Sequence, residues 1–370
     1  MHLYLHVPFC ARRCTYCDFA IAVRREVPSE VYTDLVLAEW RRWVAEPPWS
    51  EAPQLSTLYL GGGTPSLLAG DALRRIIDSI AAERPLAREA EVTLEANPED
   101  VTLAAARVWK EAGVNRVSLG VQSFAPAVLA WMHRSHDATR ARGAVQLLRE
   151  AGVDNISLDL IFALPEALER DWERDLDLAL ELEPEHLSLY GLTVESHTPL
   201  GRQVARGETQ VASEERYAAE FLAAHQRLVA AGFRHYEVSN YARPGREAVH
   251  NAAYWQRAPF LGLGPSAHSA TEGVRWWNFR EWSAWRDAML SGASAVAHEE
   301  RLGAEEVRLE RLYLGLRTDY GVGRGELPQV TLHDWRRAGW AELTGDRVRL
   351  TAEGWLRLDA LAVDAASRTG

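Results

Sequence analysis

The stretch His6-Val-Pro-Phe-Cys10-Ala-Arg-Arg-Cys14-Thr-Tyr-Cys17-Asp-Phe19 holds all three cysteines of the 370-residue chain. Their spacing is C-x3-C-x2-C, so three thiolates on one short segment can turn toward one metal centre. No cysteine elsewhere is left to form a disulfide with this group. Cysteines that serve only in core packing would not gather in this way, and we infer that the chain is organised around this segment.

The three cysteines favour an iron–sulfur centre. A [4Fe–4S] cluster normally takes four thiolates, one for each iron, so three would leave one iron open to a small-molecule ligand. A Cys3His zinc site with His6 or His2 is an alternative, because zinc accepts such ligand sets. Zinc cysteines, however, usually come as C-x2-C pairs. Three buried, inert thiols are a further alternative, but Arg12 and Arg13 between the cysteines indicate a loop.

Length and composition bound the class of protein. A chain of this length with 47% hydrophobic residues should hold two domains, or one large barrel with an appendage. The net charge of −11 argues against a general nucleic-acid binder. No run approaches the ~18 apolar residues of a transmembrane span, and the first residues lack the pattern of a signal peptide. The absence of cysteine pairs predicts a cytoplasmic location.

Short β-rich segments alternate with helical patterns over the first 200 residues, which is typical of βαβ units and a parallel sheet. Residues 111–119 align with residues 150–158 at an offset of 39, and each segment contains a helix end, a glycine C-cap and a strand. The sequence predicts an α/β fold, a partial (β/α)6 TIM-like barrel. Its strands are expected near 3–7, 55–60, 91–95, 116–120, 155–160 and 186–191.

Polar residues or glycines stand at the end of each of the first five predicted strands. The cysteine loop follows the first strand and Gly61-Gly62-Gly63-Thr64-Pro65 follows the second, while Glu95, Gln122 and Asp159 mark the next three. Active sites of parallel α/β barrels collect at the carboxyl ends of the strands. Helix capping would explain one or two of these residues, whereas a binding site explains all of them. The glycines would let the backbone approach a ligand closely.

The pattern changes after residue 198. Ser213 is predicted to cap a helix of about twenty residues, and residues 233–241 are a strand candidate that runs into a loop with His250-Asn251-Ala-Ala-Tyr254-Trp255. Charged helices over 304–316 and 332–338 and a hairpin over 341–350 with a Gly-Asp turn resemble a winged-helix-like domain. The predicted domains are therefore the partial barrel over 1–230, a barrel-closing extension over 231–298 and the winged-helix-like domain over 299–370.

The order of motifs resembles one branch of the radical S-adenosylmethionine (SAM) superfamily, which holds oxygen-independent coproporphyrinogen III dehydrogenase and its relatives. The motifs are LYLHVPFC-x3-C-x2-CDF, GGGTPS, LEANPE, SLGVQSF, MHRSH, SLDLIFALP, YEVSNYA, HNAAYW and GLGPSAHS. The resemblance runs through about residues 1–270 and, more loosely, to the C-terminus. It implies a [4Fe–4S] cluster whose open iron binds SAM, with an electron from the cluster cleaving SAM to a 5′-deoxyadenosyl radical.

Within this branch the chain is more similar to the heme chaperones than to the dehydrogenase. The dehydrogenase has a further cysteine where this chain has Phe19, and it has a long segment before its cluster where this chain has nine residues before Cys10. The segment from His250 to Trp255 matches a motif associated with the chaperones. The resemblance implies a cytoplasmic protein that binds cluster, SAM and heme, and delivers heme to apo-hemoproteins such as respiratory-chain enzymes. It also implies an electron donor for the cluster and at most transient, partner-mediated contact with a membrane.

Two other functions compete with heme transfer. One is the dehydrogenase reaction itself, the radical oxidative decarboxylation of coproporphyrinogen III to protoporphyrinogen IX. The other is radical SAM chemistry on RNA, which only the winged-helix-like tail suggests and which the acidic composition opposes. We expect no nucleic-acid partner.

The resemblance also implies roles for individual residues. The cluster ligands would be Cys10, Cys14 and Cys17. Residues beside SAM would be Tyr4, Tyr16, Gly62, Gly63, Thr64, Glu95, Gln122, Arg134 and Asp159. Asp159 suits the ribose hydroxyls, and the planar guanidinium of Arg134 suits the SAM carboxylate. Without the resemblance, Arg134 would be interpreted as a surface arginine on a helix.

A heme ligand is expected among the histidines, because neutral imidazole is a common axial ligand to heme iron. His250 is the candidate, since it stands in the chaperone motif. The alternative is a structural histidine that is hydrogen-bonded in a loop. His268, His136 and His235 are weaker candidates, and no cysteine remains for a Cys-Pro heme motif.

Overall fold

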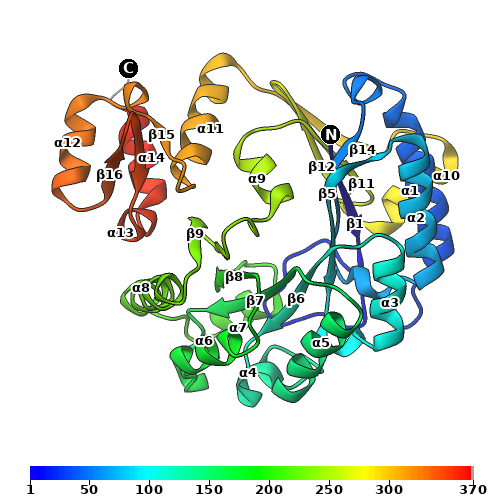
Figure 1. The fold of residues 1–370 in the computed structure, drawn as a ribbon, viewed down its shortest axis with the longest axis horizontal. Coiled ribbons are helices and arrows are strands. Elements are labelled where there is room, and N and C mark those ends of the chain that lie inside the picture. The colour runs from blue at the N-terminus through cyan, green and yellow to red at the C-terminus, as the bar shows by residue number, and fades with distance from the viewer. Residues whose placement is uncertain (368–370) are drawn as a thin grey trace.

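Six parallel strands form the centre of the fold and lie side by side in chain order. The structure is a computed structural model that describes residues 1–367. The six strands are β1 (His2–Val7), β4 (Leu55–Gly62), β5 (Leu86–Ala96), β6 (Arg116–Gln122), β7 (Ile156–Phe162) and β8 (His186–Gly191). They confirm the predicted α/β class and all six predicted strands, and they curve together as part of a barrel (Figure 1).

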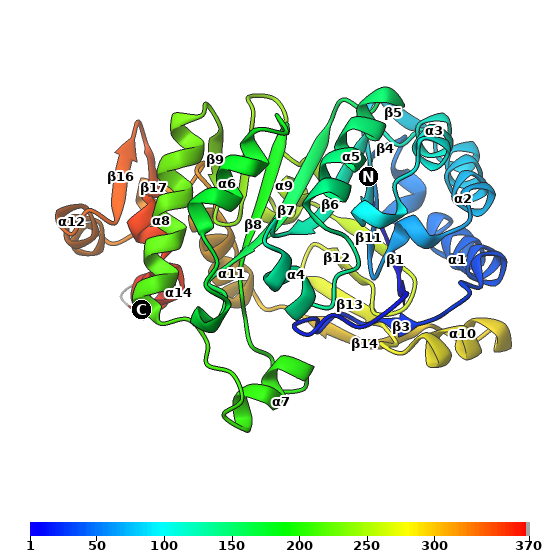
Figure 2. The ribbon, with the colours of Figure 1, turned by 90° about the horizontal axis from the view of Figure 1, so that it is seen from below.

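Helices connect these strands and cover the outer face of the sheet (Figures 1 and 2). In chain order they are α1 (Ser29–Val44), α2 (Gly70–Glu83), α3 (Leu103–Glu111), α4 (Pro126–Trp131), α5 (Ala138–Glu150) and α6 (Trp172–Leu180). Two further helices, α7 (Pro199–Ala205) and α8 (Glu214–Ala230), follow β8, and α7 lies away from the sheet (Figure 2). Helix α2 buries Leu73, Ile76, Ile77 and Ile80. This i, i+3, i+4, i+7 spacing gives one apolar face, and its burial against the sheet stabilises the layer.

The internal repeat corresponds to two consecutive helix–turn–strand units, α3 to β6 and α5 to β7. The glycines that follow the two helices both have positive φ, +103° at Gly113 and +83° at Gly152. Glycine adopts this conformation without steric cost, so it ends each helix and returns the chain to the sheet. Ser213 caps α8 as predicted, because its side chain accepts a hydrogen bond from the backbone N–H of Arg216.

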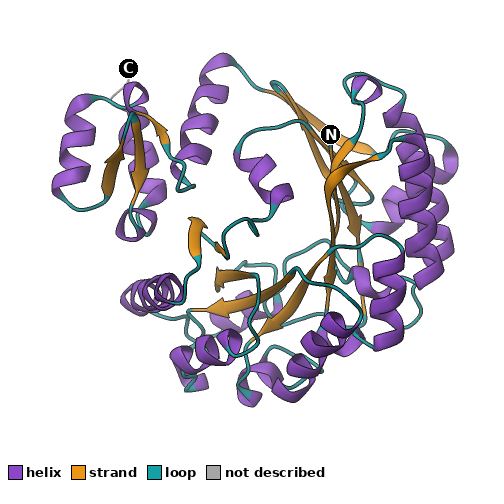
Figure 3. Cartoon of the chain, in the orientation of Figure 1, coloured by secondary structure: helices purple, strands orange, loops and turns teal. Residues whose placement is uncertain are grey.

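The sheet continues beyond both ends of the six parallel strands. Next to β1 it adds β11 (Phe260–Leu263), β12 (His268–Thr271), β13 (Val274–Asn278) and β14 (Val296–Arg301), and next to β8 it adds β10 (Asn240–Ala242) and β9 (Arg234–Glu237). Strand β11 is parallel to β1, and the other added strands are antiparallel. Within residues 1–367 the outermost strands do not pair, so the twelve-stranded sheet stays open (Figure 3). Residues 231–298 were expected to close the barrel, and they extend its edges instead.

The sequence predicted one strand over residues 233–241. The structure instead has two short strands there, joined by a turn. Strand β9 ends at Glu237 and β10 begins at Asn240. The Glu237 carboxylate holds the turn by accepting hydrogen bonds from the Ser239 backbone N–H, at 3.1 Å, and from the Asn240 side-chain amide. The turn could not be predicted from the pattern of residues along the segment, because it depends on these side-chain contacts.

The C-terminal elements keep the predicted order of helix, helix, hairpin and helix. They are α11 (Ala304–Leu316), β15 (Val322–Gly323), α12 (Gln329–Arg337), β16 (Ala341–Thr344), β17 (Arg347–Leu350), α13 (Ala352–Trp355) and α14 (Leu358–Ser367). Gly345 has a φ of +60° in the predicted hairpin turn. The boundaries after residues 230 and 298 stay predictions, and residues 368–370 of the predicted last domain lie outside the described residues. No helix in the described part of the chain is long and apolar enough to cross a membrane.

A buried carboxylate joins α1 to the strands added beside β1. Glu39 accepts hydrogen bonds from the backbone N–H of Gly264 at 2.8 Å, the side-chain amide of Asn278 at 2.6 Å and the indole of Trp285 at 3.2 Å. Burial raises the pKa of Glu39 to about 7. Gly264 follows β11, Asn278 ends β13 and Trp285 belongs to α10 (Trp282–Ser291), so one side chain holds three elements in place.

Replacement of Glu39 by alanine should therefore destabilise the protein. We expect the free energy of unfolding to fall by about 3 kcal/mol, because three buried donors lose their acceptor. Chemical denaturation measures this change. Glu46, which is exposed just beyond the end of α1, is the matched control, and Glu46→Ala should change the stability by less than ~0.5 kcal/mol. Equal effects of the two substitutions would contradict the role of Glu39.

Candidate functional site

The carboxyl ends of the parallel strands surround a cavity of about 510 Å³. Its walls come from the cysteine loop after β1, the glycine segment at the end of β4, and side chains on or after β5, β6, β7 and β8. The predicted site residues that line it are Cys10, Cys14, Tyr16, Cys17, Gly62, Gly63, Thr64, Glu95, Gln122, Arg134 and Asp159. The fold thus gathers residues from distant parts of the sequence at one rim. A cavity of this size is typical of a small-molecule site.

The cysteine loop is closed at its base by a two-stranded pairing. Strand β2 (Phe9–Cys10) runs parallel to β3 (Ala22–Val23), which follows the last cysteine. Inside the loop the backbone N–H of Cys17 donates to the carbonyl of Cys14 at 3.4 Å. All three thiols are half-buried and line the cavity, so they are not inert core residues.

Two sulfur atoms of the loop receive hydrogen bonds from other parts of the rim. The Thr64 hydroxyl donates to Sγ of Cys10 at 3.4 Å, and the Arg134 guanidinium donates to Sγ of Cys14 at 3.8 Å. Burial nevertheless raises the pKa of Cys10, and it raises the pKa of Cys17 to about 11. These thiols are protonated at neutral pH until a positive centre stabilises the thiolates, so metal binding here releases protons.

The geometry does not support a zinc site. Residues 1–367 contain no group of three or more His, Cys, Asp and Glu side chains that could hold a single metal ion. Both ring nitrogens of His6 are engaged, with the Tyr4 hydroxyl at 3.1 Å and the Ala20 carbonyl at 2.9 Å. His2 is hydrogen-bonded to the Thr57 hydroxyl at 3.0 Å. An iron–sulfur cluster binds each thiolate to a different iron and holds them farther apart than one ion does, so it fits this loop better.

The glycine segment lets the end of β4 approach the cysteine loop. Gly62 has a φ of +113°, and a Cβ atom at this position would lie 2.6 Å from Cε1 of His6. At Gly63 a Cβ atom would lie 2.8 Å from the carbonyl oxygen of Phe9. No larger residue fits at these contact distances. The glycines therefore serve the packing of the loop on β4 as well as the predicted access to a ligand.

Among the described residues, five carboxylate residues line the cavity, and two of them, Glu95 and Asp159, were predicted from the strand ends. Glu95 accepts hydrogen bonds from the Tyr59 hydroxyl at 2.8 Å and from the Gly62 backbone N–H at 2.9 Å. Asp159 accepts from the Ser118 hydroxyl at 3.0 and 3.1 Å. Burial raises the pKa of Glu95 to about 7 and also raises the pKa of Asp159. A ligand with positive charge beside these groups would lower both pKa values, so this wall favours cations.

Arg134 lies in the loop after α4 and points into the site. Its guanidinium donates to the Asn97 side-chain oxygen at 2.6 Å and to the Gly120 carbonyl at 2.7 Å. The interpretation as a surface arginine on a helix is therefore wrong. A guanidinium held in this way suits a carboxylate ligand. Nearby, Gln122 has a φ of +68° where β6 shifts its register against β7, and such strain at a cavity wall points to function.

Several residues of the site were missed by the sequence analysis. Tyr59, Asn97 and Ser118 each hydrogen-bond to a predicted site residue. Asn97 stands two residues after Glu95, and the segment after β5 carries it to the same rim. Tyr59 and Ser118 could have been predicted, because each is a polar residue within an otherwise apolar, buried strand.

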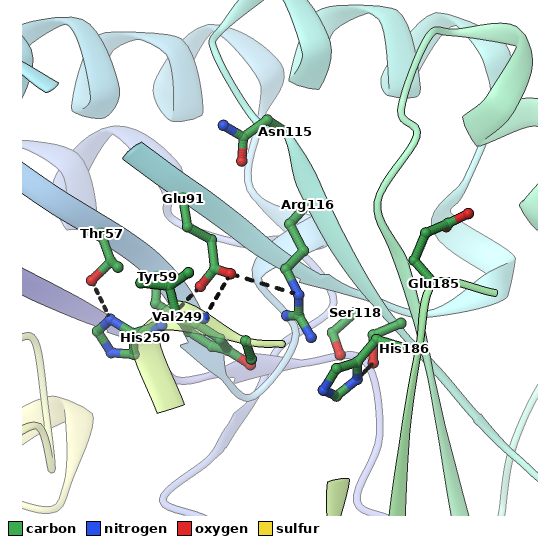
Figure 4. Close-up of polar contacts among 12 residues, drawn as sticks. Thr57, Tyr59, Glu91, Asn115, Arg116, Ser118, Glu185, His186, Val249 and His250 are labelled. Atoms are coloured by element: carbon green, nitrogen blue, oxygen red, sulfur yellow. Dashed lines mark hydrogen bonds and ion pairs between the residues drawn. The ribbon is translucent and has the colours of Figure 1, made fainter. Parts of the chain in front are cut away.

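The surroundings of His250 favour the alternative of a structural histidine over the predicted heme ligand. His250 lies in α9 (Val249–Trp255) rather than in a loop, and only 1% of it is exposed. Its Nδ1 is hydrogen-bonded to the Thr57 hydroxyl at 2.7 Å and its Nε2 to the Tyr254 hydroxyl at 2.7 Å. Its backbone N–H donates to the Glu91 carboxylate at 3.0 Å, as Figure 4 shows beside the Thr57 contact. Both ring nitrogens are engaged, so heme iron could bind His250 only if one of these hydrogen bonds were broken.

Tyr4 also departs from its expected place. It does not line the cavity of the cysteine loop but a neighbouring one. Its hydroxyl is hydrogen-bonded to His6, and its ring packs against Tyr59 and His250 at centroid distances of 6.0 and 6.3 Å. Side chains alternate along β1, so Tyr4 lies on the same face as His6, and both line the neighbouring cavity.

Comparisons with known proteins place the chain among radical SAM proteins. Residues 4–179 match the family model of the radical SAM superfamily. The heme chaperone HemW of Mycobacterium tuberculosis is 37% identical over 366 residues, which cover 97% of this chain and 93% of the relative. HemW of Bacillus subtilis is 33% identical over 366 residues, covering 95% and 96%. Coproporphyrinogen III oxidase (HemN) from Escherichia coli, a radical SAM enzyme, superposes with a TM-score of 0.82 over 99% of this chain and 90% of that chain. Its identity of 20% makes this a likeness of fold alone.

The contact between the glycine segment and the cysteine loop can be tested by Gly62→Ala. The new Cβ atom meets the His6 ring and the residue must keep a positive φ, so we expect the free energy of unfolding to fall by about 3 kcal/mol. Gly143 provides a control, because it lies inside α5 with nothing within 4 Å of the Cβ position. Gly143→Ala should raise the stability by about 0.5–1 kcal/mol. Denaturation of both variants decides the matter, and a neutral Gly62→Ala would refute the packing role.

Proposed function

The chain belongs to the HemW heme chaperone family of the radical SAM superfamily, and from this membership we propose that it binds heme and delivers it to apo-hemoproteins. One observation carries the proposal: identity of 37% with a heme chaperone extends over 97% of the chain. It therefore includes the added strands and the C-terminal elements, and is not confined to the superfamily domain. The likeness to coproporphyrinogen III oxidase concerns the fold alone, and supports no transfer of that activity.

Membership of the radical SAM superfamily implies a [4Fe–4S] cluster and SAM as cofactors. We assign Cys10, Cys14 and Cys17 as the thiolate ligands, which leaves one iron for SAM. Together the two cofactors supply one-electron cleavage of SAM when they are bound. The support for the assignment is that the three thiols line one cavity with the carboxylates and Arg134.

The charges of the cavity match the charges of SAM. We propose that Arg134 binds the carboxylate of its methionine part and that Glu95 faces its amino group, beside the Gly62–Thr64 backbone. Asp159, fixed by Ser118, suits the ribose hydroxyls as a paired acceptor. Gln122 and the backbone at Tyr16 complete the pocket. A guanidinium and a carboxylate in one cavity distinguish the carboxylate of the methionine part from its amino group, and so fix the orientation of that part.

The proposal also covers the partners of the protein and its location in the cell. We propose that the recipients of heme are apo-hemoproteins such as respiratory-chain enzymes, and that a separate protein donates electrons to the cluster. We further propose that the chain acts in the cytoplasm and meets a membrane only transiently, through its partners. The net charge of −11 supports this, since it opposes binding to anionic lipid surfaces and to nucleic acid.

One experiment separates the proposed function from the dehydrogenase reaction. The protein is reconstituted anaerobically with iron and sulfide, and then divided between a heme titration and an assay of coproporphyrinogen III conversion with SAM and a reductant. We expect saturable heme binding and no protoporphyrinogen IX. Robust turnover of coproporphyrinogen III would overturn the proposal, and so would the absence of heme binding.

Replacement of Cys14 by serine tests the cluster assignment. The reconstituted variant should lose the brown absorbance of the cluster and most of its bound iron, because an alcohol replaces a thiolate ligand. Arg13→Ala, an exposed change on the same loop, should keep both. Iron content that is unchanged in Cys14→Ser would refute the three-cysteine assignment.

The pH dependence of SAM binding tests Glu95. Its raised pKa of about 7 means that the carboxyl group is largely protonated at pH 6 and ionised at pH 8. Since the cationic amino group prefers the ionised form, the affinity for SAM should rise with pH through this window. In Glu95→Gln the affinity at pH 8 should be roughly tenfold lower, equivalent to about 1.4 kcal/mol, and the contribution of Glu95 to the pH dependence should vanish. A variant that retains both the affinity and the pH profile would argue against this role.

A further inference from the structure

A second cavity, of about 550 Å³, adjoins the cavity of the cysteine loop. Asp18 and Phe19 line both cavities, so the end of the cysteine loop separates them. The second cavity is bounded by β1, by α9 with the segment after it, by β12 and β13, and by α11. Apart from Tyr4, none of the described residues with a proposed role toward the cluster or SAM lines it. Its purpose is therefore not explained by those cofactors.

Flat aromatic side chains form much of the wall of the second cavity. Tyr254 and Trp255 come from α9, and Phe260 begins β11. The rings of Tyr254 and Phe260 meet edge to face at 4.5 Å. Phe19 projects from the cysteine loop with 59% of its surface exposed, which is a large apolar area beside a cavity. Such walls favour a large, flat and apolar ligand.

Cationic side chains stand at the same cavity. Arg257 and Arg275 both donate to the Glu310 carboxylate, at 2.6 and 2.7 Å, and Arg280 donates to the backbone carbonyl of Asp18 at 2.5 Å. The lining therefore holds three guanidinium groups against two carboxylates, those of Asp18 and Glu310. Arg275 is also paired with the Glu300 carboxylate, at 3.1 Å, whereas the printed contact of Arg280 is to a backbone carbonyl and leaves its charge available to a ligand. That charge suits a ligand with carboxylate substituents.

His268 offers a free imidazole to this cavity. It begins β12, its side chain is exposed, and its ring stacks on Trp277 with centroids 5.3 Å apart and an interplanar angle of 24°. In the described part of the chain, neither ring nitrogen of His268 has a hydrogen-bond partner. The protein around the ring partly desolvates it although one side stays open to solvent, and this desolvation and the nearby Arg275 lower the pKa of His268, which favours the neutral imidazole.

The other candidate histidines have no free nitrogen. Both ring nitrogens are hydrogen-bonded in His6, His136, His235 and His250. A nitrogen that already has a partner can bind iron only if that hydrogen bond breaks. His268 therefore combines what the others lack, a free lone pair and a position in an aromatic cavity.

We propose that the second cavity binds heme and that His268 is the axial ligand to its iron. The inference rests on the proposed function, from which the class of ligand is taken. The macrocycle stacks on the aromatic wall, and its propionates face the arginines. The segment from His250 to Trp255 still belongs to the heme site, because it supplies Tyr254 and Trp255 to the wall while His250 fixes Tyr254 from behind.

The test is a heme titration of the full, reconstituted chain and two variants. In His268→Gly we expect the affinity for heme to fall roughly tenfold or more and the Soret band to shift. Added imidazole should restore the original band, because it can occupy the vacated position. His298→Ala is the matched control: His298 is also exposed, its ring lies 4.7 Å from that of Trp277, and it does not line the cavity. This control should bind heme like the unaltered chain.

Each outcome decides one claim. If the unaltered chain binds heme and His268→Gly has the same affinity and spectrum, the inference is overturned and the proposed function stands. Loss of binding that imidazole does not restore, in a variant that keeps its cluster absorbance, overturns the ligand role. If the unaltered chain binds no heme, the proposed function falls and the inference with it. His268→Tyr guards against misfolding of the glycine variant, because it keeps a ring beside Trp277 and should give the spectrum of a tyrosinate-ligated heme.

Discussion

The close contact between the end of β4 and the loop before Cys10 is the constraint on which the site depends. Gly62 and Gly63 leave no room for a Cβ atom against His6 and Phe9. Because the two segments touch, Thr64 reaches the sulfur of Cys10 and the three thiols face the cavity. A larger residue in this place would push the loop off the rim, and the thiols would lose their common direction.

The rest of the cavity is arranged by charge. The carboxylates of Glu95 and Asp159 are held by hydroxyl and backbone donors on one wall, and Arg134 is held by carbonyl oxygens beside the cysteine loop. Within residues 1–367 none of these three groups forms a direct ion pair with a side chain of opposite charge. Their fields are therefore available to a ligand, and burial strengthens that field because little water screens it.

The sequence predicted what depends on local pattern. The alternation of strand and helix patterns predicted the parallel sheet. The regular position of Asp159 and its counterparts predicted that a site lies at the carboxyl ends of the strands. It could not predict contacts between distant segments. Thr57 engages one ring nitrogen of His250 from a strand 193 residues earlier in the chain, and no local pattern marks this contact. The second cavity was likewise beyond sequence reasoning, because Tyr4 and the arginines meet there only through the order of the added strands.

Phe19 gives the two cavities a common wall, and this has a thermodynamic consequence. A ligand that shifts this ring in one cavity alters the shape of the other, so the two binding equilibria become linked. Linkage is reciprocal. If a ligand in the first cavity changes the affinity of the second cavity by some factor, a ligand in the second cavity must change the affinity of the first by the same factor. If the first cavity holds the cluster and SAM and the second holds heme, as we propose, Phe19 would let the state of the cofactors set how tightly heme is held.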